Sequence, residues 1–185
     1  MNPLYFIPPL AALAYLTARN TRYGLYIILA TIPGYLLQTN IWFIPTTWLE
    51  LAIYTVAIVT LFKHVRGKTL VPHIFYVMRH IRDYIVPVSF LLIAVLVSIF
   101  ISDTQARAFG ILKAWFFAPL LLGVILIDEI HIKNISALIV SISLSAWTIM
   151  LYGLYEYSAG SGMTIPGRLD AFFSSPNYVA MYMVT

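Results

Sequence analysis

The segment 167–178, GRLDAFFSSPNY, holds the polar residues of this sequence that are best suited to bind an anion. Ser174 or Ser175 is a good N-cap and Pro176 suits the first position of a helix, so we predict that a helix begins here. A helix N-terminus presents free backbone N–H groups and the positive end of the helix dipole, and both attract anions. Arg168 could reach the same point, and a guanidinium forms bidentate hydrogen bonds with phosphate oxygens. The pattern fits a phosphate or pyrophosphate site and, equally, an ordinary capped loop whose arginine meets lipid headgroups.

Several other charged residues are predicted at the same depth and on the same face as this segment. Glu50, in IPTTWLELAIY, could stabilise a helix N-terminus through the helix dipole, or it could orient a buried arginine or a polar substrate. Glu156 closes another apolar run, and Asp170 follows Arg168 closely. Charged side chains are costly in lipid, so their convergence on one face makes Glu50, Glu156 and Asp170 candidate supporting residues of a site. A surface role is the default prediction for the other charged residues of this face, Asp103, Arg107 and Lys113.

The chain offers no residue that we can assign to catalysis. It has no cysteine, P-loop, HExxH pair or glycine-rich dinucleotide turn. On the topology derived below, the histidines all fall on the face opposite to 167–178; they are His64, His73, His80 and His131. We therefore predict no catalytic residue within this chain, no metal and no other cofactor.

The elements that must position these residues are membrane helices. Of the 185 residues, 61% are hydrophobic and 10% are charged, with a mean hydropathy of +0.88, whereas soluble domains carry about 25% charged residues. We predict an all-α fold, a polytopic transmembrane helix bundle that forms a single transmembrane domain over residues 1–185. Spans need roughly 20 apolar residues, and six are predicted, with a seventh starting near Pro176, at 4–16, 23–37, 44–62, 84–101, 110–127 and 135–157.

The basic residues give the predicted orientation. Eight of the eleven fall on one side of the predicted spans: Arg19, Arg22, Lys63, Arg66, Lys68, Arg79, Arg82 and Lys133. The positive-inside rule makes that side cytoplasmic, so the N-terminus and a loop at 158–175 lie at the outer face. Residues 69–82 are predicted to form an amphipathic helix on the inner membrane surface, or alternatively a helix that binds a partner protein. The net charge of +4 belongs to loops between spans, so we expect membrane lipids and no nucleic acid as partners.

The segment 167–178 resembles the O-antigen ligase and polymerase family of multi-pass bacterial membrane proteins. The resemblance rests on an arginine followed by F-x-x-P-N at the mouth of a membrane helix, here Arg168, Phe173, Pro176 and Asn177. Two other stretches are similar to that family. One is IPTTWLELAIY, with a proline before and a glutamate within an early helix, and the other is SDTQARAFGILKAWFFAPLLL, a loop leading into a helix. The resemblance covers essentially the whole chain, as the N-terminal half of such a protein.

The resemblance implies a multi-pass glycosyltransferase of the bacterial cytoplasmic (inner) membrane that works in surface polysaccharide biosynthesis. Such proteins take a glycan from an undecaprenyl-pyrophosphate carrier at the outer face, and either transfer it to an acceptor or polymerise repeat units, without a metal. By resemblance, Arg168 contacts the pyrophosphate, and the site is shaped by Phe173, Ser175, Pro176 and Asn177. The family's catalytic histidine is expected in the second half, so this chain is expected to be incomplete and inactive alone.

Two other functions remain open from the sequence, a transporter or permease fragment and a non-catalytic membrane scaffold. Transporters favour inverted repeats, broken helices and charges at the bilayer midplane. Here the charges fall at span ends and no internal repeat is visible. A scaffold would bind no glycolipid.

Overall fold

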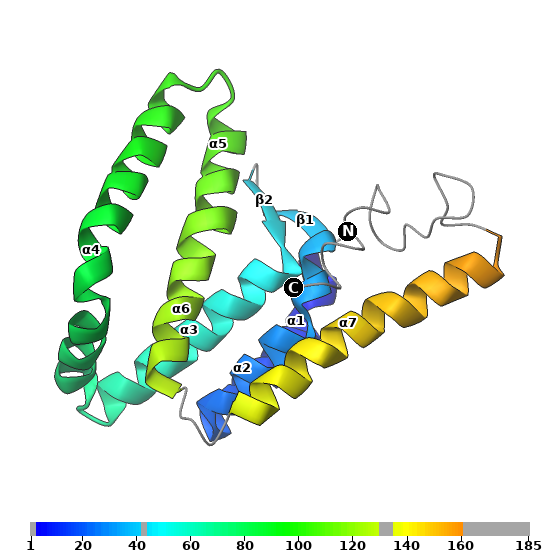
Figure 1. Ribbon diagram of the computed structural model, residues 1–185, viewed down its shortest axis with the longest axis horizontal. Coiled ribbons are helices and arrows are strands. Elements are labelled where there is room, and N and C mark those ends of the chain that lie inside the picture. Colours follow the sequence, from blue (N-terminus) through cyan, green and yellow to red (C-terminus); the bar gives the residue numbers. More distant parts are fainter. Residues whose placement is uncertain (1–2, 42–43, 130–134, 161–185) are drawn as a thin grey trace.

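The computed structural model describes residues 3–41, 44–129 and 135–160. Helices account for almost all of these residues, which confirms the predicted all-α class (Figure 1). In chain order the elements are η1 (Pro3–Phe6), α1 (Ile7–Arg19), α2 (Thr21–Ala30), η2 (Ile32–Leu36), β1 (Gln38–Ile41), β2 (Ile44–Thr47), α3 (Trp48–Arg66), α4 (Leu70–Ile101), α5 (Gln105–Leu112), the π-helical turn η3 (Lys113–Phe117), α6 (Ala118–Glu129) and α7 (Ile135–Ser158).

Four helices in the described part of the chain are long and apolar enough to cross a membrane. They are Trp48–Arg66, Leu70–Ile101, Gln105–Ile127 and Ile135–Ser158, with 19, 32, 23 and 24 residues. These helices correspond to the third, fourth, fifth and sixth predicted spans. Most of their apolar side chains face outward, as lipid-facing residues of a membrane bundle do. A membrane protein with several apolar helices is therefore supported.

The first two predicted spans are short helices that pair with each other and pack on α3. Helix α2 ends at Ala30 and does not run on to residue 37 as predicted, because Pro33 and Gly34 turn the chain into the 3₁₀ segment η2. Asn20 separates α1 from α2, and its side chain accepts a hydrogen bond from the Arg22 N–H at 3.0 Å. This is the N-cap arrangement that starts a helix.

A β-hairpin, β1–β2, precedes α3 and was not predicted from the sequence. The strands pair antiparallel, with Gln38 opposite Thr47 and Ile41 opposite Ile44. Residues 44–47 were predicted as the beginning of the third span, and that boundary is wrong. Pro45 cannot donate a backbone hydrogen bond, and the β-branched residues beside it favour an extended chain. The Trp48 N–H donates to the Leu37 carbonyl at 3.0 Å, which ties the hairpin directly to the start of α3.

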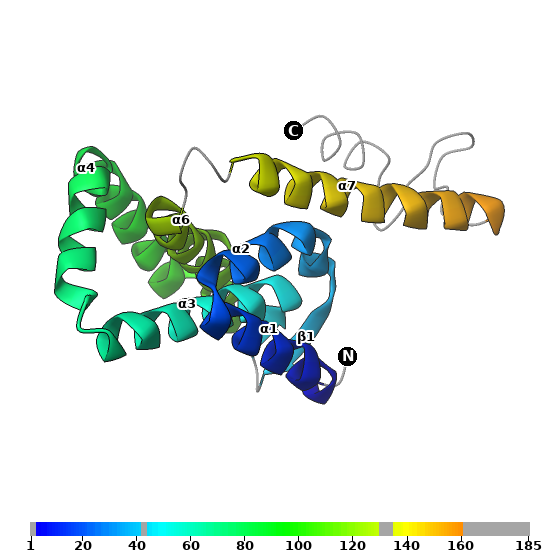
Figure 2. The same cartoon turned by 90° about the horizontal axis from the view of Figure 1, so that it is seen from below.

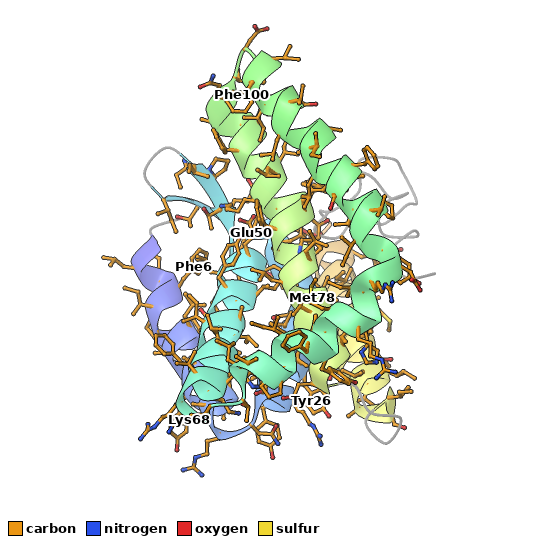
Figure 3. All side chains as sticks on the ribbon, turned by 90° about the vertical axis from the view of Figure 1, so that its left-hand side faces the viewer. Phe6, Tyr26, Glu50, Lys68, Met78 and Phe100 are labelled. Carbon is orange, nitrogen blue, oxygen red and sulfur yellow. The ribbon has the colours of Figure 1, made fainter. Side chains whose placement is uncertain are left out.

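Helix α4 unites two predicted elements. The predicted surface helix at 69–82 and the predicted span at 84–101 form one helix of 32 residues, about 48 Å at 1.5 Å per residue. Figures 2 and 3 show that its first part crosses one end of the bundle before the helix turns toward Phe100. Pro87 lies inside α4, where it removes a backbone hydrogen bond and allows bending. Whether residues 69–82 lie on the cytoplasmic surface remains a prediction.

The core lies where α1, α2, α3 and α6 meet. It contains fully buried aliphatic residues such as Ile28, Ala52 and Val56. In the same core, Trp48 at the start of α3 packs against Phe6, with ring centroids 5.7 Å apart. In Figure 3, Lys68 and Tyr26 mark one end of the bundle, Phe100 marks the other, and Glu50 lies between them.

Gly24 allows the three N-terminal helices to approach closely. A Cβ atom at Gly24 would overlap the Thr17 hydroxyl and lie 2.9 Å from a methyl group of Val56. Thr17 is completely buried, and its hydroxyl donates to the Leu13 carbonyl at 2.7 Å. Neither neighbour can move without disturbing the core, so any side chain at position 24 would push α2 away from α1 and α3.

We expect Gly24→Ala to destabilise the protein by about 1–3 kcal/mol, the usual cost of overpacking a core. The matched control is Gly123→Ala in α6, where a Cβ would meet nothing within 4 Å. Alanine favours a helix over glycine by about 1 kcal/mol, so the control is expected to be neutral or slightly stabilising. Thermal unfolding in detergent measures both, and equal melting temperatures for the two variants would contradict the close approach at Gly24.

Candidate functional site

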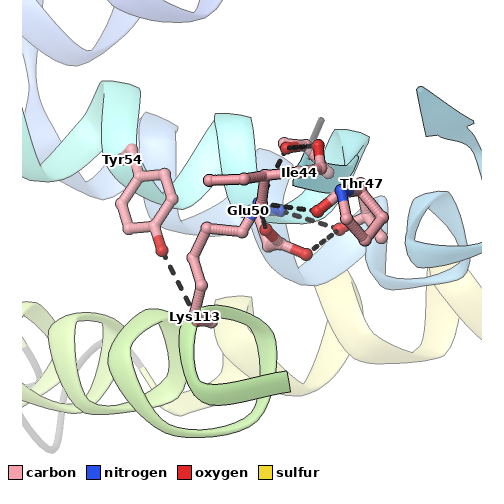
Figure 4. A network of polar contacts seen from close by, with 7 residues as sticks. Ile44, Thr47, Glu50, Tyr54 and Lys113 are labelled. Carbon is pink, nitrogen blue, oxygen red and sulfur yellow. Dashed lines mark hydrogen bonds and ion pairs between the residues drawn. The ribbon is translucent and has the colours of Figure 1, made fainter. Parts of the chain in front are cut away.

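The polar cluster that we take as the candidate site is built around Glu50 in the first turn of α3 (Figure 4). Thr47 is the N-cap of this helix, and its hydroxyl accepts a hydrogen bond from the Glu50 N–H at 3.3 Å. The same hydroxyl lies 3.1 Å from Glu50 Oε1, to which it donates. The carboxylate is thus fixed beside the positive end of the helix dipole. This agrees with the first of the two interpretations of Glu50, that it stabilises a helix N-terminus.

Lys113 provides the counter-charge. Its ammonium nitrogen lies 2.7 Å from Glu50 Oε2, and the side chains are 22% and 5% exposed for Lys113 and Glu50 respectively. It also donates to the Pro45 carbonyl at 2.9 Å and to the Thr46 hydroxyl at 2.7 Å. Two of the three N–H donors of the ammonium are used in these hydrogen bonds, and its contact with Glu50 is an ion pair. The ion pair is the contact that compensates Glu50 Oε2, which is buried and accepts no hydrogen bond from the described residues.

Lys113 is also the first residue of the π-helical turn η3. The Ala118 N–H donates to the Lys113 carbonyl across this turn, and the Tyr54 hydroxyl donates to the same carbonyl at 3.4 Å (Figure 4). A π turn widens the helix and re-aims the residues within it, and such turns are frequent at functional sites. Here the turn presents Lys113 to β2 and to the first turn of α3.

Close backbone packing holds the two sides of the cluster together. A Cβ at Gly110 would lie 3.0 Å from Pro45 Cγ, so the glycine lets α5 lie directly against β2. The sequence predicted Lys113 close to the start of a span. Because α5 begins at Gln105, Lys113 in fact lies two turns inside an apolar helix. A charge within an apolar span is costly unless it is paired. Glu50 and the carbonyl and hydroxyl groups of β2 supply that pairing.

A cavity of about 250 Å³ lies next to the cluster, between η2, the start of α3 and the middle of α7. Its lining is almost entirely apolar and consists of Ala30, Thr31, Pro33, Gly34, Leu36, Leu37, Trp48 and Thr148. The pocket is partly open, and its apolar lining favours contact with an apolar group. The cavity therefore suits part of a hydrocarbon chain and not a polar ligand.

The other described residues of the predicted site are placed separately. Glu156 lies in the last turns of α7, where its side chain forms a hydrogen bond with Tyr152. Asp103 lies in the link between α4 and α5, and Arg107 is exposed on α5. The structure thus brings Lys113 to Glu50.

The predicted anion site itself lies outside the described residues. This holds for Arg168, Asp170, Phe173, Ser175, Pro176 and Asn177, and for most of the predicted loop at 158–175. Its geometry stays a prediction. Among the histidines, His64 and His73 stack with ring centroids 4.1 Å apart. Within residues 3–41, 44–129 and 135–160, no group of three or more histidine, cysteine, aspartate or glutamate side chains could hold a metal ion.

Comparison of the chain with protein-family models, with curated proteins and with solved structures finds no match. The resemblance to the O-antigen ligase and polymerase family therefore stays a prediction, and the argument for a function rests on the residues themselves.

Sequence reasoning missed that Lys113 is the partner of Glu50. Two signals could have found it. Thr47-Trp48-Leu49-Glu50 has the T-x-x-E pattern of a capping box, which places Glu50 at the third position of a helix. Lys113 is the only charged residue of the apolar run 110–127, and a lysine in such a run requires a carboxylate or carbonyl partner.

We expect Glu50→Gln to destabilise the protein by about 3–5 kcal/mol, because it leaves the Lys113 ammonium without its counter-charge. The double variant Glu50→Gln/Lys113→Met is expected to recover part of this loss. The control is Glu129→Gln, which breaks the more exposed ion pair of Arg22 and Glu129, 3.3 Å between Arg22 Nε and Glu129 Oε2. Such pairs contribute about 0–1 kcal/mol.

Unfolding free energies of the wild-type protein, Glu50→Gln, Lys113→Met and the double variant, measured in detergent with a denaturant, form a double-mutant cycle for Glu50 and Lys113. Glu129→Gln is measured beside them. A Glu50→Gln variant no less stable than Glu129→Gln, or a double variant worse than the sum of its parts, would show that the ion pair does not stabilise the fold.

Proposed function

We propose that this chain belongs to the machinery of surface polysaccharide (O-antigen) assembly in the bacterial cytoplasmic membrane. It binds an undecaprenyl-pyrophosphate-linked glycan at the outer face, in a protein that transfers or polymerises such glycans. Arg168 contacts the pyrophosphate, and Phe173, Ser175, Pro176 and Asn177 shape the helix mouth around it.

The observation that carries this proposal is the Glu50–Lys113 ion pair at 2.7 Å. Glu50 comes from IPTTWLELAIY and Lys113 from SDTQARAFGILKAWFFAPLLL, the two stretches that resemble the family in addition to segment 167–178. They lie about sixty residues apart in the sequence, yet a buried ion pair, two hydrogen bonds and the Gly110–Pro45 contact join them. Such a rigid arrangement is what a binding site needs from the elements that support it.

The proposal counts the two short N-terminal helices as the first two spans. Segments η1 and α1 run without a break from residue 3 to residue 19, and α2 with η2 extends from residue 21 to residue 36. At 1.5 Å per residue, α1 is about 20 Å long and α2 about 15 Å, so each needs its flanking 3₁₀ segment to approach the roughly 30 Å thickness of the hydrocarbon core. Counted with the four longer helices, they give six spans, and Pro176 begins a seventh.

The apolar cavity beside the cluster is consistent with this ligand. An undecaprenyl carrier joins an anionic pyrophosphate to a long hydrocarbon chain, so its site must offer a cation near an apolar surface. On the proposed topology, Arg168 supplies the cation at the outer face. The cavity lined by Trp48 and the residues of η2 holds part of the carrier's hydrocarbon chain. The chain's residues bind and position the carrier, and we assign no catalytic residue among them.

We expect the purified protein to bind undecaprenyl pyrophosphate and Arg168→Ala to bind it about 10- to 100-fold more weakly, since a hydrogen bond to a charged group contributes about 1.5–3 kcal/mol. The matched control is Arg79→Ala, which removes an exposed arginine predicted on the cytoplasmic side. Thermal stabilisation by increasing concentrations of the lipid measures each affinity.

Three results would contradict the proposed function. The first is equal binding by the wild-type protein and Arg168→Ala. The second is saturable uptake of a small solute into liposomes that contain the protein, which would favour a transporter. The third is absence of any lipid pyrophosphate binding, which would favour a scaffold.

A further inference from the structure

The end of the bundle opposite to Phe100 carries a dense set of positive charges. Residues 63–82 join the last turn of α3 to the first turns of α4, and we call them the basic arm. From residue 51 to residue 82 the sequence has no aspartate or glutamate. The basic arm holds Lys63, Arg66, Lys68, Arg79 and Arg82 together with three histidines, His64, His73 and His80.

The described residues place no carboxylate in ion-pair contact with these charges, although Asp83 follows Arg82 directly in the sequence. In the part of the chain that the structure describes, Arg66, Lys68, Arg79 and Arg82 take part in no ion pair. Lys63 differs, because its ammonium donates to the Thr21 hydroxyl at 3.0 Å and fastens α3 to the start of α2. The remaining four cations are available to a partner outside the protein.

The first part of α4 also exposes apolar side chains next to these cations. Val77 is buried and faces the bundle, while Val71, Ile74, Phe75 and Met78 are 61%, 49%, 72% and 47% exposed. On a helical wheel Phe75 falls between Arg79 and Arg82, so aromatic and guanidinium groups alternate on one outward surface. Figures 2 and 3 show this part of α4 lying across the end of the bundle and not along it.

A helix that lies across the end of a membrane bundle, with exposed aliphatic and aromatic residues among arginines, fits the interface between headgroups and acyl chains. There the apolar side chains enter the acyl region, and the long cationic side chains extend to the headgroups. Basic clusters next to transmembrane helices attract anionic lipids by roughly 1 kcal/mol per lysine or arginine.

We propose that the basic arm is a binding site for anionic phospholipids, whose phosphodiester headgroups contact Lys68, Arg79 and Arg82 while Phe75 and Met78 enter the acyl region. This role differs from setting orientation during membrane insertion, because it requires that the folded protein retains anionic lipid. It is also independent of the proposed carrier site, which lies at the other face.

The test is lipid binding by the whole chain, purified in a neutral detergent, with phosphatidylglycerol and phosphatidylcholine of identical acyl chains. Native mass spectrometry counts the bound lipids. We expect more bound phosphatidylglycerol than phosphatidylcholine. Each single variant, Lys68→Gln, Arg79→Gln or Arg82→Gln, is expected to weaken phosphatidylglycerol binding roughly fivefold and to leave phosphatidylcholine binding unchanged.

Arg107→Gln is the matched control, because Arg107 is exposed on α5 beyond the basic arm. It is expected to leave the preference for phosphatidylglycerol unchanged. The salt dependence of lipid binding by the wild-type protein tests the proposal even if a variant folds poorly. Raising the salt from about 0.1 M to 1 M shortens the Debye length from about 10 Å to 3 Å, so the preference is expected to fall.

Equal binding of the two lipids by the wild-type protein would overturn the proposal, as would a preference that salt does not change. An Arg107→Gln variant that loses as much phosphatidylglycerol as the arm variants would overturn it too, since the charge would then act without regard to its place. Binding of a soluble acidic protein in place of lipid would identify the basic arm as a protein-docking surface.

Discussion

The structure around the start of α3 depends on one requirement, that the Lys113 charge inside an apolar helix be compensated. Glu50 meets it through an ion pair at 2.7 Å, and the Pro45 carbonyl and Thr46 hydroxyl accept two hydrogen bonds from the ammonium. To bring these groups to Lys113, the chain before α3 must be extended, must turn back as a hairpin, and must lie against α5. The β-hairpin, the glycine at position 110 and the π turn at Lys113 are therefore parts of one solution. Without the charge on Lys113, the β-hairpin, Gly110 and the π turn would no longer be needed to bring polar groups to this position.

The long apolar helices could be predicted from the sequence because hydrophobic runs report length directly. The sixth predicted span, 135–157, differs from α7 by one residue at its end. The fifth began too late, since the polar residues Gln105 and Arg107 looked like loop residues although they form the first turn of α5. Local composition determines whether a segment is apolar, but it does not show that a polar turn continues a helix.

The elements that sequence reasoning missed are those that depend on contacts between distant residues. The β-hairpin has polar residues such as Gln38 and Asn40 in β1 and a proline in β2, and neither strand shows the alternation that predicts a sheet. Its stability comes from α5 and from the first turn of α3, which a single sequence does not place beside it. The same holds for the site. Glu50 was a candidate because a carboxylate in an apolar run is unusual, but only the fold shows that its partner is a lysine more than sixty residues away and not an arginine.

The pairing of Lys113 determines where an anion could bind at this face. Its ammonium donates to a carbonyl and a hydroxyl and forms an ion pair with a carboxylate, so its charge is already offset by Glu50. A ligand that took Lys113 would have to displace Glu50 and leave a buried carboxylate without compensation, which is strongly unfavourable. The lysine therefore supports the first turn of α3 and does not bind the carrier, and the binding of a pyrophosphate in the proposed function falls to Arg168. In contrast, Arg66, Lys68, Arg79 and Arg82 at the other end are exposed and form no ion pair within the described residues, so in the proposal they can exchange one lipid headgroup for another. The two groups of positive charge thus have opposite physical roles, because one is fixed by internal partners and the other depends on partners in the membrane.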